Sequence, residues 1–277
     1  MSLAKINLAC GSTYLSDDGW INFDYMSSSP SVSKADLLGR LSLADDSATL
    51  VYSSHFLEHI PRSDVPAFLH ECHRVLAPGG VLRLVLPDLE NMVREYLAMR
   101  ETGEHEKADF VVLEMVDQCV RRESGGELGR FYGQLRAKPN ASTDSMMDYV
   151  RERVGEDLRA AVDPKIARGV QFKLRRLFSA LRGRIERYWL RLWILALPAA
   201  FRTQNVSLAG VGERHHWLWD FHQLRQALES AGFTEVQRRT ANSSGIVDFP
   251  FHPLDLDADD RPRKGAESMY VEARKPD

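Results

Sequence analysis

The residues best suited to chemistry lie in two loops, each of which follows an apolar run of the chain. Five polar side chains follow the strands expected at 48–53 and 81–86, namely His55, Glu58, His59, Asp88 and Glu90. Imidazole and carboxylate groups are the usual proton acceptors and donors of active sites. In an open parallel sheet, ligands bind outside the carboxyl ends of the strands. The pattern therefore predicts a polar active site at that edge.

Helices and strands alternate along both ends of the chain. Strands are expected at 5–10, 20–25, 35–37, 48–53, 81–86, 233–239 and 268–273. Helices are expected at about 64–76, 89–101 and 221–231, with Ser63 and Asp220 as N-caps and Gly232 after the last helix. This alternation predicts βαβ units and a mostly parallel α/β sheet.

A long segment separates the two halves of this core. We expect an N-terminal part of the core at 1–103, a helical insertion at 104–210 and the C-terminal part at 211–277. The insertion is expected to hold two or three helices and a loop around 124–143, where Gly, Pro and Asn gather.

The insertion contains a strongly basic helical pattern after Asp163-Pro164. Residues 165–191 hold nine Lys or Arg and one Glu, in a chain whose net charge is −3. Apolar residues recur there at helical spacing, and aromatic and apolar residues continue to Phe201. Three interpretations stay open: a cap over the active site, a helix lying on an anionic membrane surface through 165–201, and a nucleic-acid contact, which we favour least.

Bulk properties indicate a globular protein. The chain has 277 residues, 44% of them hydrophobic and 27% charged. Its three cysteines lack the spacing of paired metal ligands and are expected to be reduced thiols. No signal-peptide pattern and no apolar run of about 18 residues occurs, so we expect a cytoplasmic protein without a membrane span.

The first strand ends in a small-residue turn, N-L-A-C-G-S at 7–12, which lacks the glycine pattern of a dinucleotide site. Small residues let the backbone approach a ligand closely. Asp24 ends the second strand and could accept hydrogen bonds from a ribose diol. The alternative is a plain strand-end turn with a capping aspartate.

Several motifs extend these observations over about residues 5–100. They are L-A-C-G at 8–11, G-W-I-N-F-D at 19–24, S-S-H-F-L-E-H at 53–59, E-C-H-R-V-L-A-P-G-G at 71–80 and P-D-L-E at 87–90. With them the chain resembles class I S-adenosylmethionine-dependent methyltransferases, in the type 11-like group. The resemblance implies a Rossmann-like sheet, mostly parallel with the last strand antiparallel, that carries a helical insertion.

The resemblance also implies a set of residues that bind S-adenosylmethionine: Ala9, Cys10, Gly11, Asp24, Asp36, Leu37, Ser53 and Ser54. The backbone of the first three would run along the methionine part of the cofactor, and Asp24 would bind the ribose hydroxyls. Asp36 would take the adenine amine with Leu37 beside it, and Ser53 and Ser54 would flank the sulfonium. Ala9 stands where the group usually has glycine, and the stretch after Asp36 lacks the common Leu-Pro-Phe.

Methyl transfer to oxygen depends on alignment and on a base that takes the acceptor proton. We expect His59 or His55 to be that base, with Asp88 orienting it; alternatively, Glu58 and His59 support the fold. A lid or substrate wall resembling that of the related group would include Glu90, His215, His216 and Trp217. We expect no metal site, because the histidines at 215, 216 and 252 lack the usual ligand spacing.

The leading hypothesis is O-methylation of a sugar, a glycan or a lipid-linked glycan, by a cytoplasmic protein that attaches peripherally to the inner face of the membrane. One alternative is an RNA methyltransferase that uses the basic insertion. Another is a non-catalytic, membrane-associated module that keeps a cofactor site.

Overall fold

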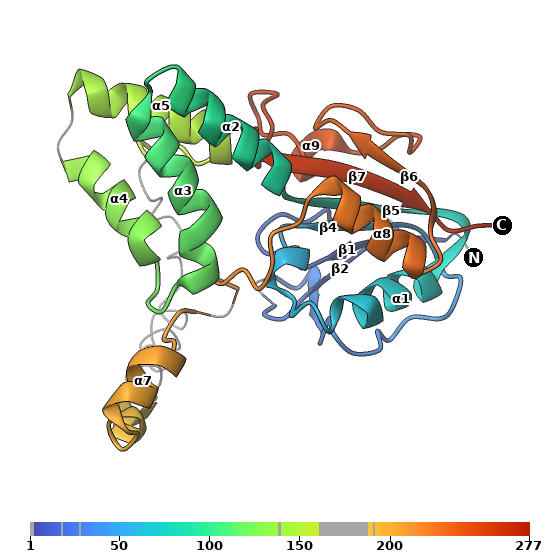
Figure 1. Cartoon of the computed structure of the whole chain (residues 1–277). Helices are drawn as coiled ribbons and strands as arrows, with labels where there is room; N and C mark the ends of the chain where they lie inside the picture. Colours follow the sequence, from blue (N-terminus) through green and yellow to red (C-terminus); the bar gives the residue numbers. More distant parts are fainter. Residues whose placement is uncertain are drawn as a thin grey trace, which may run out of the picture.

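The computed structural model describes residues 3–160, 188–210 and 212–277, except Asp18, Ser28, Lys138, Pro139 and Arg191. A sheet lobe and a helical lobe lie side by side in this part of the chain, and α7 projects from the helical lobe (Figure 1). Both described ends of the chain lie at the far end of the sheet lobe, away from the helical lobe.

The sheet lobe is built on seven strands in the order β3-β2-β1-β4-β5-β7-β6. Their bounds are β1 Ala4–Leu8, β2 Trp20–Asp24, β3 Val32–Lys34, β4 Ala48–Ser54, β5 Leu76–Pro87, β6 Thr234–Arg239 and β7 Ser268–Arg274. Strands β1 to β5 pair in parallel, whereas β7 runs antiparallel to both β5 and β6. The predicted fold class, mostly parallel with an antiparallel last strand, is confirmed.

Helices α1 (Val65–Val75) and α8 (Phe221–Ser230) cover the sheet, with the 3₁₀ turn η1 (Leu57–His59) before α1. The predicted apolar face of α1 is buried, as Phe68 and Leu69 show. The predicted N-cap is wrong, since the helix starts after Asp64 and the Ser63 hydroxyl donates to the Asp64 carboxylate. Asp220 does cap α8, by accepting the backbone N–H of Gln223.

The helical lobe consists of α2 (Leu89–Glu101), α3 (His105–Val120), α4 (Gly126–Ala137) and α5 (Ala141–Val154). Its core includes Met92 from α2, Phe110 from α3, Tyr132 from α4 and Val150 from α5. The loop expected around 124–143 is wrong, because most of it forms α4 and the start of α5. Burial of apolar side chains such as Tyr132 outweighs the cost of glycines in a helix, about 1 kcal/mol each.

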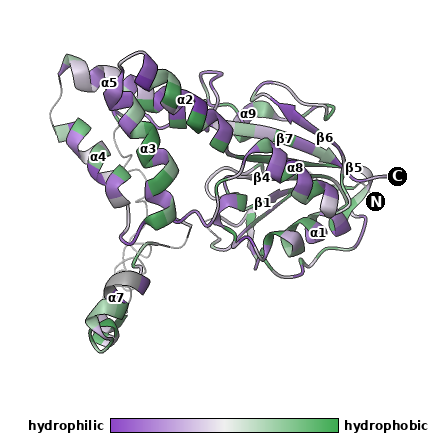
Figure 2. Cartoon of the chain, viewed as in Figure 1, coloured by the Kyte–Doolittle hydropathy of each residue, from purple (hydrophilic) through white to green (hydrophobic). Residues whose placement is uncertain are grey.

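Most of the basic helix expected at 165–191 lies outside the described residues. The described segment that follows, residues 188–205, is called the apolar arm here, and it ends in α7 (Ala199–Asn205). Large apolar side chains are exposed along it, among them Trp189, Trp193 and Phe201, with Trp193 71% exposed. Figure 2 shows hydrophobic colouring on α7, which stands apart from both lobes. Within the described residues, no helix combines the length and the apolar character needed to cross a membrane.

One buried cation joins the middle of the sheet to the segments around β7. Arg83 on β5 is fully buried, and it donates to the Asp255 carboxylate at 2.7 and 2.9 Å and to Glu272 of β7 at 2.7 Å. It also donates to the backbone carbonyls of Thr240 and Ser243, after β6. All the hydrogen bonds of the guanidinium are therefore made inside the protein.

We expect Arg83→Met to destabilise the protein by about 3–5 kcal/mol, because two buried carboxylates lose their cation. The free energy of unfolding in urea measures the change. Arg225→Met is the matched control, since Arg225 pairs with Glu229 on the exposed face of α8 and such pairs contribute less than about 1 kcal/mol. Equal effects of the two substitutions would contradict this account.

Candidate active site at the carboxyl ends of the strands

A cavity of about 200 Å³ lies against the end of β1, and we call it the strand-end cavity. Its wall consists of Asn7, Ala9, Cys10, Gly11, Ser12, Thr13, Tyr52, Ser54, His55, Arg263 and Lys264. The backbone at both Ala9 and Gly11 is left-handed, with φ of 54° at each, so the turn folds back sharply after β1. The predicted small-residue turn therefore lines a cavity, as a ligand site requires.

Asp24, at the end of β2, holds this turn in place. One carboxylate oxygen accepts the Gly11 N–H at 2.9 Å and the other accepts the Met26 N–H at 2.9 Å. The side chain remains partly exposed, with lone pairs left over for further hydrogen bonds. Asp24 can thus stabilise the turn and bind a diol at the same time.

The residues expected near adenine follow β3, and they point in different directions. Asp36 is exposed, and its carboxylate accepts the Leu38 N–H at 3.1 Å. Leu37 is buried in the core of the sheet lobe, while Leu38 is 45% exposed. The apolar surface that this turn offers to a ligand therefore comes from Leu38 rather than from the predicted Leu37.

The end of β4 supplies hydroxyl groups, and a distant loop supplies positive charge. Ser54 lines the strand-end cavity, and the buried Ser53 hydroxyl has no hydrogen-bond partner among the described residues. Arg263 and Lys264 line the same cavity, where a carboxylate ligand such as the methionine end of S-adenosylmethionine would find cations. These donors and cations fit that cofactor. Burial lowers the pKa of Lys264.

The loop that carries Lys264 is pressed against the end of α5. Gly155 and Gly265 both have left-handed backbones, with φ of 77° and 64°. A Cβ atom on Gly155 would lie 2.2 Å from the Arg263 carbonyl oxygen, and one on Gly265 would lie 2.2 Å from that of Arg153. Only glycine at these two positions allows the backbones to come so close. The contact places Lys264 between the two lobes.

A second cavity of about 510 Å³, the interlobe cavity, lies between the sheet lobe and α3, α4 and α5. His55, His59 and His215 line its sheet side, and the opposite side includes Gln118, Arg121, Tyr132 and Glu156. His55 and Lys264 belong to the walls of both cavities. The two cavities therefore meet at these two side chains.

His55 is held by the sheet. Its backbone N–H donates to Val85 of β5 at 2.7 Å, and its ring Nε2 lies 2.9 Å from the Ser268 hydroxyl oxygen. That hydroxyl donates its own proton to the Lys264 carbonyl, so it accepts from Nε2–H. The lone pair of His55 is then on Nδ1, which lies 3.4 Å from a carboxylate oxygen of Glu58.

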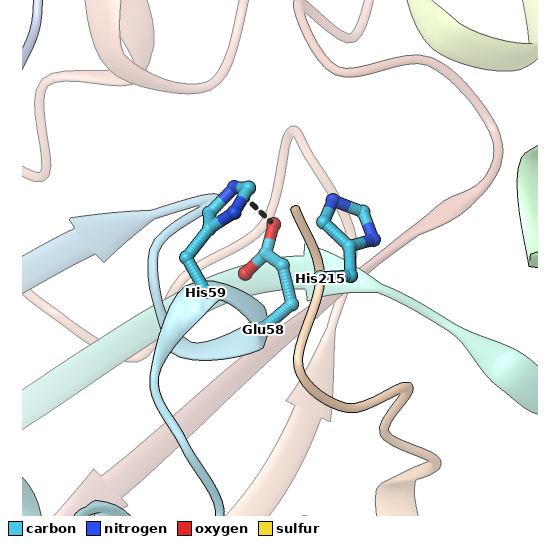
Figure 3. Close-up of side chains that lie close together, drawn as sticks. All are labelled: Glu58, His59 and His215. Carbon is cyan, nitrogen blue, oxygen red and sulfur yellow. Dashed lines mark ion pairs between the residues drawn. The ribbon is translucent and has the colours of Figure 1, made fainter. Parts of the chain in front are cut away.

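His59 has the opposite tautomer. Its Nδ1–H donates to the Arg214 carbonyl at 2.7 Å, because a carbonyl can only accept. The lone pair is then on Nε2, which lies 3.9 Å from Glu58 (Figure 3). Backbone bonds fasten this turn to the segment before α8, since the His216 N–H donates to the Glu58 carbonyl at 2.7 Å.

Burial decides the protonation state of the three histidines and of Glu58. It lowers the pKa of His55 well below the ordinary value, lowers that of His59 and lowers that of His215 to about 3. Burial also raises the pKa of Glu58 to about 8. Near neutral pH the three imidazoles are therefore uncharged and carry free lone pairs.

The expected role of Asp88 does not match its contacts. Its carboxylate caps α2 by accepting the Glu90 N–H at 3.1 Å, and it pairs with Arg238 at 3.1 Å. None of its described contacts is a histidine; the carboxylate beside His55 and His59 is Glu58. We expected Asp88 near the histidines because the loops after β4 and β5 leave the sheet at the same edge. Its side chain instead caps α2.

Of the four expected substrate residues, His215 lines the interlobe cavity. Glu90 pairs with Arg94 on α2, and the Trp217 indole donates to Gln223 of α8. His216 is exposed and lies outside the described cavity wall. Lys264 was missed as a site residue because no motif surrounds it. Glu58 was noted among the polar residues after the fourth strand, but it was given no role beyond supporting the fold.

A family model described as a methyltransferase domain matches residues 22–84, from β2 to β5, including the 53–59 motif. No curated protein matches the chain. The solved structures to which it is similar include an S-adenosylmethionine-dependent methyltransferase from Archaeoglobus fulgidus, at 12% identity and a TM-score of 0.41, covering 99% of this chain and 86% of that one.

Another similar structure is a complex of the Haloferax volcanii Trm112 methyltransferase activator with a putative methyltransferase, at 13% identity and a TM-score of 0.39, covering 100% of this chain and 86% of that one. A possible exported protein from Bordetella parapertussis aligns at 12% identity and a TM-score of 0.35. The alignment covers 99% of this chain and 63% of that protein, so this chain spans less than two thirds of its length.

We expect Asp24→Ala to weaken binding of S-adenosylhomocysteine about 10-fold to 100-fold, because a charged acceptor of hydrogen bonds is lost. Isothermal titration calorimetry measures the affinity, and thermal melting checks that the variant is folded. Asp17→Ala is the control, since Asp17 is an exposed aspartate before β2. Unchanged affinity of the folded Asp24 variant would remove the ribose role from this residue.

Proposed function

We propose that this class I S-adenosylmethionine-dependent methyltransferase methylates a hydroxyl group of a glycan or of a lipid-linked glycan precursor. The observation that carries the proposal is the junction of the two cavities at His55 and Lys264. A cofactor in the strand-end cavity and an acceptor in the interlobe cavity would meet at these side chains. In-line transfer requires this kind of alignment.

The chain holds the two reactants by different means. Asp24 would bind the ribose hydroxyls, and Arg263 and Lys264 would bind the methionine carboxylate. When bound, the cofactor would supply an electrophilic methyl group: its S–CH₃ bond would break to leave S-adenosylhomocysteine, and the acceptor would exchange its O–H bond for an O–CH₃ bond and release one proton. His55 Nδ1 takes that proton, because it carries the lone pair at the junction of the cavities.

The polar wall of the interlobe cavity supports a hydroxyl-rich acceptor. Gln118, Arg121, Glu156 and Glu213 contribute hydrogen-bonding groups of both kinds to that wall, and Tyr132 adds an aromatic ring. Such a mixture of donors, acceptors and an aromatic face suits a sugar better than an apolar substrate.

The apolar arm supports a lipid-linked acceptor and peripheral attachment to an anionic membrane. Exposed Trp189, Trp193 and Phe201 have the composition of an interfacial anchor. The sequence before the arm is strongly basic, and clustered Lys and Arg attract anionic lipids at about 1 kcal/mol per residue near the surface. A polyisoprenoid-linked sugar would lie at such a surface.

We expect His55→Ala to lower kcat by about 10²-fold to 10⁴-fold, the usual contribution of a general base. Transfer of radiolabelled methyl groups to free glycans and to polyisoprenoid-linked sugars measures the rate. Binding of S-adenosylhomocysteine should change by only a few-fold, which separates loss of the base from loss of the cofactor site. Full activity in the variant would exclude His55 as the base, and absence of transfer by the wild-type chain to any glycan would refute the acceptor class.

We expect the triple substitution Trp189→Ser, Trp193→Ser, Phe201→Ser to lower binding to vesicles of phosphatidylglycerol and phosphatidylcholine at least about tenfold. Vesicle sedimentation measures the bound fraction. Val247→Ser is the control, because Val247 is 84% exposed on the sheet lobe. Failure of the wild-type chain to sediment with vesicles would refute membrane attachment, and retention on RNA instead would favour the RNA alternative.

A further inference from the structure

We propose that Glu58, His59 and His215 form a binding site for one divalent transition-metal ion of the Zn²⁺ type, at the sheet side of the interlobe cavity. The sequence indicated no such site, since the ligand set comprises two adjacent residues and one more than 150 positions later. One carboxylate oxygen and two imidazole nitrogens lie within 4.8 Å of one another. Figure 3 shows the three side chains close together, with the His59 ring facing the Glu58 carboxylate and His215 beside them.

With Glu58 ionised, the cluster contains hydrogen-bond acceptors and no donor among its ligand atoms. His59 Nε2 carries a lone pair, because its Nδ1–H is used on the Arg214 carbonyl. Glu58 is 1% exposed, and neither of its carboxylate oxygens has a hydrogen-bond partner among the described residues. The same holds for the buried His215 Nδ1. Unpaired buried polar atoms are costly, and a cation at the centre of the cluster would bind one carboxylate oxygen and two imidazole nitrogens.

The surroundings of the cluster resemble those of established metal sites. A metal-binding histidine normally donates its second ring N–H to a carbonyl or carboxylate, as His59 does to Arg214. The His215 backbone N–H donates to Gln118 of α3 at 3.0 Å, and the adjacent His216 N–H donates to the Glu58 carbonyl. Both ligand segments are therefore held before an ion arrives.

Two imidazoles and one carboxylate suit zinc and its neighbours, at metal–ligand distances of about 2.0–2.2 Å. Bond lengths of that size separate tetrahedral ligand atoms by about 3.4 Å, so small side-chain rotations would close the present spacing. Three protein ligands leave a coordination position open, as in catalytic zinc sites. His59 and His215 line the interlobe cavity, and the open position would face it.

A role of the ion in methyl transfer would rest on the proposed function, whereas binding of the ion does not. A hydroxyl oxygen coordinated at the open position would lose its proton more readily. His55 lies beside Glu58 and is absent from the ligand set, so it would remain available to receive that proton. The alternative state of the cluster is a protonated Glu58 that donates to His55, which would need no metal.

The test uses the full chain after treatment with a chelator, without cofactor or acceptor. Calorimetry with Zn²⁺ and the visible absorption of bound Co²⁺ measure affinity, stoichiometry and geometry. We expect one ion per chain in the wild type, with a Co²⁺ spectrum typical of four or five ligands. Glu58→Gln and His215→Ala should each weaken binding more than about 100-fold, since loss of even an outer-shell partner costs 10-fold to 100-fold.

His70→Ala is the matched control, because it removes an exposed imidazole from α1 and should leave the affinity unchanged. Glu58→Gln preserves the shape of the buried side chain, and its melting curve verifies the fold. Absence of one-to-one binding in the wild type, or undiminished binding in the folded Glu58→Gln protein, would overturn the site. Calorimetry with S-adenosylhomocysteine on the same samples tests the cofactor site separately, so failure of one proposal can be distinguished from failure of the other.

Discussion

The buried Arg83 guanidinium is the interaction on which the rest of the architecture depends. It joins β5, which lies between β4 and β7 in the sheet, to β7 through Glu272 and to the start of the 255–267 loop through Asp255. Because a buried cation without partners is so unfavourable, these segments can adopt few other arrangements. The same loop carries Arg263 and Lys264, so the ion network indirectly places the positive charge of the strand-end cavity.

A second constraint is the contact between α5 and that loop. Gly155 and Gly265 let two backbones touch, and this contact fastens the helical lobe to the sheet lobe beside Lys264. On the opposite side of the interlobe cavity, the end of α3 binds the segment that carries His215. The cavity is thus enclosed by two independent attachments of one helical lobe. In the proposed function, this arrangement sets a polar cavity for the acceptor beside the strand-end cavity.

Much of the sheet lobe was predictable, because its strands are short apolar runs separated by turn residues. The predictions of β1, β2, β4 and α2 are correct to within a few residues, and the last strand is antiparallel as the resemblance implied. The helical lobe was harder to predict, since α4 contains three glycines and derives its stability from packing against neighbouring helices. Local propensity cannot indicate such packing, so residues 126–137 were mistaken for a loop.

The amino-acid sequence by itself determined the order of the elements in the sheet lobe, the small-residue turn at Ala9 to Gly11, and the placement of His55 and His59 after β4. Local patterns suffice for these, because each depends on neighbouring residues along the chain. Only the tertiary structure decided that Glu58 rather than Asp88 faces the histidines, that His215 joins them and that Lys264 lies between two cavities. Those contacts join positions up to about 200 residues apart. A side chain near a strand end can cap a helix or face a cavity, and the packing of distant segments decides between the two.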